Sequence, residues 1–134
     1  MRAGLLRFLR ILSASTFCGW IFWAAVIEIH LRYFEPGEFS DRLVYDAVLA
    51  TMLHLIRYFY YDLAIIFTVS IIHFAMDRFD VRRLWVHIFL WMIYGTVSSS
   101  ISRVEFIVAV PVAALAGAIY WVLAGRVAGE TVSR

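Results

Sequence analysis

The sequence predicts an all-α fold: an integral membrane four-helix bundle with both termini in the cytoplasm. Its second helix is expected to be unusually long or to be preceded by an interfacial helix. Hydrophobic residues make up 63% of the 134 positions and charged residues 16%, against about 45–50% and about 25% in soluble domains. A soluble fold of this size could not bury so much apolar surface, so the surrounding solvent is expected to be lipid. Apolar stretches of membrane-spanning length alternate with short charged connectors.

The second apolar stretch, Val44–Met76, runs for 33 residues without a glycine or a proline. As one helix it would reach ~50 Å, whereas the hydrocarbon core of a bilayer is roughly 30 Å thick. We therefore expect a helix over about residues 44–77, of which about 58–77 lies in the membrane and begins at an aromatic girdle, Tyr58, Tyr60 and Tyr61. Residues 41–57 either continue this helix or lie flat at the membrane surface, and the sequence leaves both alternatives open.

The remaining spans are expected at about residues 11–33, 82–100 and 105–125, which makes residues 1–134 a single transmembrane domain. A basic start before an apolar run is also the pattern of a cleaved signal peptide. The first apolar run is bulky and lacks a small-x-small exit, which favours an uncleaved first span. Pro36-Gly37 gives the clearest break in the chain.

The distribution of arginine indicates the orientation in the membrane. Eight of the twelve basic residues flank the chain ends and the second connector, namely Arg2, Arg7, Arg10, Arg78, Arg82, Arg83, Arg126 and Arg134. The others belong to the first and third connectors or their flanks, namely Arg32, Arg42, Arg57 and Arg103. By the positive-inside rule both termini lie in the cytoplasm, and the expected location is the bacterial inner (cytoplasmic) membrane.

The four histidines fall at two depths of this topology, as two pairs. His30 and His54 are expected near the outer face, and His73 and His87 several residues inside the inner face. Two haem b groups stacked in a bundle would need such pairs, because each iron takes one imidazole from each of two facing helices. Against this, His54 and His73 differ by about 100° around their shared helix. Structural histidines that hydrogen-bond between helices explain the same pattern.

A second set of ionisable residues gathers at the outer end of the first two spans: Glu28, Arg32, Arg57 and Asp62. Ionisable groups at membrane depth cost several kcal/mol unless they are paired or hydrated, which makes them candidates for a functional site. The set could form a proton or ion path, or a polar socket for a lipid headgroup or a quinone. Alternatively, Glu28 or Asp62 pairs with Arg57 and ties two helices together. Glu28 and Arg32 also have the i,i+4 order that favours an ion pair within one helix.

The fourth span carries small residues at every fourth position, Ala109, Ala113 and Gly117. Such a face lets another helix backbone approach closely. This face favours one function for the protein: a small non-catalytic subunit or accessory factor of the inner membrane, which packs against partner membrane chains or against copies of itself.

Two alternatives stand beside this function: a two-haem b-type cytochrome that exchanges electrons with quinone, and a channel or carrier built on Glu28, Arg57 and Asp62. The sequence contains no Walker loop, nucleophile elbow, zinc-protease helix or dinucleotide fingerprint, so it gives no support to an enzyme. No metal site is expected, and the small net charge of +2 argues against nucleic acid as a partner. The expected partners are membrane lipids and other membrane chains.

Overall fold

The computed structural model describes residues 2–34, 43–81, 83–102 and 105–129 as four α-helices with short connections and, within these ranges, no strand. The helices are α1 (Arg2–Phe34), α2 (Leu43–Arg78), α3 (Leu84–Ser102) and α4 (Phe106–Gly129). All four are long and apolar enough to cross a membrane. The prediction of an all-α membrane protein is confirmed in the number of its helices and in their length and apolar character.

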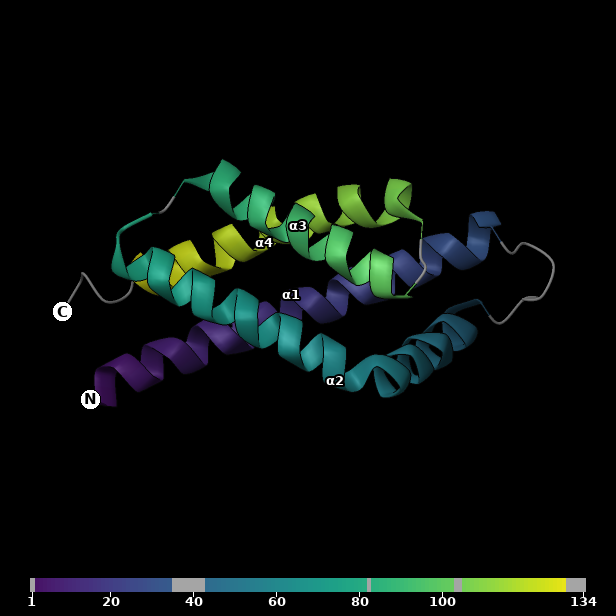
Figure 1. Cartoon of the computed structure of the whole chain (residues 1–134), viewed down its shortest axis with the longest axis horizontal. Helices are drawn as coiled ribbons and strands as arrows, with labels where there is room; N and C mark the ends of the chain where they lie inside the picture. Colours follow the sequence, from purple (N-terminus) through teal and green to yellow (C-terminus); the bar gives the residue numbers. More distant parts are fainter. Residues whose placement is uncertain (1, 35–42, 82, 103–104, 130–134) are drawn as a thin grey trace.

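Successive helices run in alternating directions, so that the start of α1 and the end of α4 lie at the same end of the molecule (Figure 1). The backbones of α3 and α4 approach each other most extensively, and α1 packs against both α2 and α4. The α2 and α3 backbones meet over only a short stretch. Around the molecule the order is therefore α1, α2, α3, α4, with α2 the helix least covered by its neighbours.

Helix α2 is continuous over 36 residues, Leu43–Arg78. Of the two alternatives that the sequence left open, the structure has the long helix rather than a separate interfacial one, although residues 41–42 lie outside the described residues. Helix α1 is also longer than the predicted span, because it begins at Arg2 instead of about residue 11. No proline interrupts residues 2–10, so the helix continues through the arginine-rich start.

The connection between α2 and α3 closes with a left-handed turn. The N–H of Val81 donates to the carbonyl of Met76 at 2.8 Å, and Asp80 adopts a φ of 57°. Glycine usually occupies such a position after a helix, but aspartate tolerates it better than most side chains do. This tight turn brings the end of α2 and the start of α3 together, and with them the side chains one turn inside each helix.

Helices α3 and α4 pack through small residues. A Cβ atom added to Gly95 would lie 2.6 Å from the Cβ of Ala113 and 3.0 Å from the carbonyl oxygen of Ala109. A Cβ atom at Gly117 would lie 2.9 Å from the Cα of Ile88. The buried face formed by Ala109, Ala113 and Gly117 thus lies against α3 of the same chain.

Large aromatic side chains fill the interior, among them Phe22, Trp91, Tyr94 and Tyr120. The outer surface is apolar as well, and large hydrophobic side chains are exposed on every helix. An apolar exterior around an interior that contains serine, histidine and tyrosine is expected when lipid is the solvent.

Candidate functional site

Two buried histidines meet near the end of the molecule where α2 passes into α3. The Nδ1 atoms of His73 and His87 are 3.1 Å apart, and the two rings stack with their centroids 5.0 Å apart. On its other side His73 stacks on Tyr120 of α4, with a centroid distance of 3.9 Å. We call His73, His87 and Tyr120 the histidine cluster.

The contact between the two histidines constrains their protonation. In a hydrogen bond between two Nδ1 atoms, one ring supplies the N–H and the other supplies the lone pair, so the two nitrogens share a single proton. His87 also lies beside the carbonyl of Val81 and faces the Asp77 carboxylate. Asp77 is in turn ion-paired with Arg7 of α1. The cluster is therefore connected to the polar end of the bundle through Asp77 and Arg7.

This geometry does not fit the haem alternative at His73 and His87. Axial ligation by two histidines places the iron and the plane of the macrocycle between the two ligating nitrogens, whereas these nitrogens are in direct hydrogen-bonding contact. In the other predicted pair, the His54 ring lies tilted between the rings of Trp23 and Tyr58, with centroid distances of 4.0 and 4.7 Å and an interplanar angle of 41° to each. The side chains of His54, His73 and His87 therefore pack against other rings, and His73 and His87 share a hydrogen bond. His30 lies half-buried near the end of α1.

The predicted outer set of Glu28, Arg32, Arg57 and Asp62 separates into independent groups. Glu28 accepts hydrogen bonds from Arg32 at 2.8 Å (Nε) and 2.5 Å (Nη2), which confirms the expected i,i+4 pair. Arg57 lies over the ring of Tyr58, 5.5 Å from its centroid. Among the described residues neither Glu28 nor Asp62 forms an ion pair with Arg57, so the alternative in which such a pair ties α1 to α2 is not realised.

Asp62 lies among residues of two other helices. Its Oδ2 atom is buried and has no hydrogen-bond partner among the described residues. The indole of Trp23 lies beside the carboxylate, and Tyr94 faces it from α3, next to both Trp23 and Ser98. Gly19 leaves room for the Tyr94 hydroxyl, which would lie 3.4 Å from a Cβ atom at that position. We call Trp23, Asp62, Tyr94 and Ser98 the Asp62 cluster.

The sequence pointed to Asp62, but it missed Trp23 and Tyr94. One signal was present, because Tyr94 and Ser98 are one helical turn apart and present two hydroxyls on one face of α3. The aromatic character of Trp23 and Tyr94 did not mark them, because it is as typical of membrane anchoring as of a buried site.

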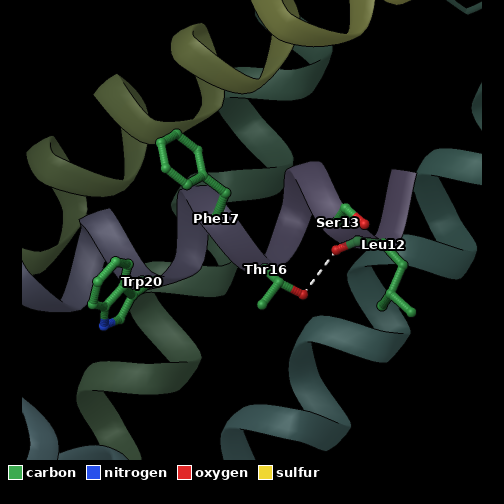
Figure 2. Close-up of a pocket in the computed structure, with 5 residues that line it drawn as sticks. All are labelled: Leu12, Ser13, Thr16, Phe17 and Trp20. Atoms are coloured by element: carbon green, nitrogen blue, oxygen red, sulfur yellow. Dashed lines mark hydrogen bonds between the residues drawn. The ribbon is translucent and has the colours of Figure 1, made fainter. Parts of the chain in front are cut away.

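A surface depression of about 520 Å³ lies on the outer face of α1, and none of its lining residues belongs to either cluster (Figure 2). It is lined by Leu12, Ser13, Thr16, Phe17 and Trp20. The two hydroxyls in it donate to carbonyls of their own helix, Ser13 to Leu9 at 2.9 Å and Thr16 to Leu12 at 2.8 Å. Because both hydroxyls already donate to carbonyls of α1, the depression presents an apolar surface to lipid, and neither hydroxyl is free to donate to a ligand.

The candidate site is therefore internal to the bundle, with the histidine cluster close to the α2–α3 connection and the Asp62 cluster further along α2. Both join α2 and α3 to a third helix, α4 in the first case and α1 in the second. Each combines groups that exchange protons with groups that stack. Comparison of the chain with protein families, with curated protein sequences and with solved structures found no match.

Proposed function

We propose that this protein is a non-catalytic membrane subunit or accessory factor that works by packing α2 against another membrane chain. The observation that carries this proposal is the apolar face that α2 leaves uncovered along its length. The small residues of α4, which could have formed such a contact, already pack against α3. That leaves α2 as the helix with the most uncovered surface.

The amino-terminal part of α2 supports the proposal most directly. Helix α2 has 36 residues and α3 has 19, so α2 is 17 residues longer, or about 25 Å at the rise of an α-helix. Along this part Ile56 is 74% exposed and Tyr60 is 82% exposed. Large apolar and aromatic side chains are the residue types that anchor protein interfaces. An apolar helix that extends so far beyond the length of α3 is stabilised where a partner chain covers it.

We further propose that both termini face the cytoplasm of a bacterium and that the protein lies in the inner membrane. The described ends of α1 and α4 lie at one end of the molecule (Figure 1). Arg7, Arg78 and Arg83 belong to helix ends or a connection at that same end. An excess of arginine on one side is what the positive-inside rule associates with the cytoplasm.

Truncation of the α2 face tests the association. In mild detergent or nanodiscs the wild-type protein should run as a complex heavier than the 15.5 kDa chain. The double variant Ile56→Ala/Tyr60→Ala should weaken that complex by about tenfold or more, since loss of an interface anchor costs more than about 1 kcal/mol. Native mass spectrometry over a dilution series measures the change.

The matched control truncates equally exposed side chains on α4, as Ile107→Ala/Leu115→Ala, and should leave the complex intact. A wild-type protein that stays monomeric with nothing bound, or a control that dissociates as readily as the α2 variant, would contradict the proposal.

A further inference from the structure

The Asp62 cluster contains four buried polar atoms that lie beside one another but form no hydrogen bond of standard geometry with any described residue. They are Trp23 Nε1, Asp62 Oδ2, Tyr94 Oη and Ser98 Oγ. Trp23 and Tyr94 are each 2% exposed and Ser98 is 1% exposed. Native proteins rarely leave such atoms unpaired, and where several gather, an ordered water molecule commonly supplies the missing bonds.

The chemical types of these groups limit what can bind between them. The indole N–H of Trp23 can only donate a hydrogen bond, and the hydroxyls of Tyr94 and Ser98 can donate as well as accept. An ionised Asp62 can only accept. An indole N–H cannot ligate a metal ion, whereas a water molecule can accept from the donors and donate to the carboxylate at the same time. The arrangement therefore suits water and a proton better than a metal cation.

No cation faces Asp62 from the helices packed against α2, within the part of the chain that the structure describes. Trp23 faces it from α1, and Tyr94 and Ser98 lie on the side of α3. On α2 itself, the His54 ring packs tilted against the Trp23 ring, and Arg57 lies over Tyr58. An unpaired carboxylate at membrane depth is costly, and the cost falls when the group binds a proton or is hydrated.

We propose that Asp62 is a proton-binding group that exchanges its proton with water held among Trp23, Tyr94 and Ser98. A proton passes from hydronium to Oδ2, giving a neutral carboxylic acid and leaving water, and the reverse step restores the carboxylate. No bond between heavy atoms changes and no electron moves, so no co-reactant is needed. This role is independent of the packing function proposed for α2, because the cluster lies on the inner side of that helix.

Infrared difference spectroscopy on the whole protein in nanodiscs tests the proposal, with spectra recorded between about pH 8 and about pH 4. The wild-type protein should gain the carbonyl band of a protonated carboxylic acid, and this band should shift in D2O. Asp62→Asn should remove one component of the band. The control Asp77→Asn should retain that component, because Asp77 is ion-paired with Arg7 outside the cluster.

Tyr94→Phe and Ser98→Ala provide a second readout that keeps Asp62 in place. Each should move the Asp62 component to higher frequency, because the carboxyl group loses hydrogen bonding. If Asp62→Asn does not fold, these two variants decide the question. An unchanged band in Asp62→Asn, a band that neither hydroxyl variant moves, or a band change that requires sodium ions in the buffer would overturn the proposal.

Discussion

His73→Ala is expected to destabilise the protein by about 2–4 kcal/mol. The His73 side chain is almost fully buried, so its removal leaves a cavity between His87 and Tyr120. It also leaves the Nδ1 atom of His87 without the partner that lies 3.1 Å away. Thermal unfolding in a fixed detergent, followed by intrinsic tryptophan fluorescence, measures the loss.

A double-mutant cycle with His87→Ala separates the shared hydrogen bond from the cavity. Because each single variant removes the same bond, the two losses of stability should be non-additive by about 1 kcal/mol. Phe89→Ala serves as a truncation control at an exposed position of α3 and should change stability by less than about 0.5 kcal/mol. Additive effects of His73→Ala and His87→Ala would contradict the contact.

Gly95→Ala is expected to destabilise the protein by about 1–3 kcal/mol, the usual cost of overpacking. The new methyl group would meet the Cβ of Ala113 at 2.6 Å and the carbonyl oxygen of Ala109 at 3.0 Å, and neither can rotate away. The clash outweighs the gain of about 1 kcal/mol that alanine has over glycine within a helix. The same thermal unfolding experiment measures the difference.

Two further variants make this test specific. Ala113→Gly in the Gly95→Ala background removes the closest contact and should restore part of the lost stability. Gly4→Ala, whose added methyl group meets nothing within 4 Å, should leave stability unchanged or raise it slightly. If Gly95→Ala proved as well tolerated as Gly4→Ala, the close approach of α3 and α4 would be wrong.

The sequence was sufficient to predict four apolar helices, because length, hydropathy and charged connectors report on each segment by itself. It also indicated that His73 and His87 lie at one depth on helices joined by a short connector, and the structure brings them together. The predicted α3 and α4 boundaries are within about one turn of those observed. Helix α1 extends further because its arginine-rich start carries no proline.

The rotation of each helix about its own axis was not predictable from the sequence. In a membrane both the buried face and the lipid-facing side of a helix are apolar, so periodicity distinguishes them poorly, and α2 and α4 are apolar nearly all round. For that reason the sequence could not show whether the small-residue face of α4 packs against α3 or against a partner chain. The neighbours of Asp62 were missed for the same reason, since Trp23 and Tyr94 reach it from separate helices.

Cysteine accessibility tests most directly the central claim that the four helices cross the membrane in alternating directions. With the buried Cys18 replaced by alanine, single cysteines are introduced at three exposed positions as Tyr33→Cys, Asp80→Cys and Glu105→Cys. A membrane-impermeant maleimide applied to sealed vesicles of known orientation should label positions 33 and 105 from one side and position 80 from the other. Labelling of positions 33 and 80 from the same side would contradict the topology, and with it the placement of both buried clusters.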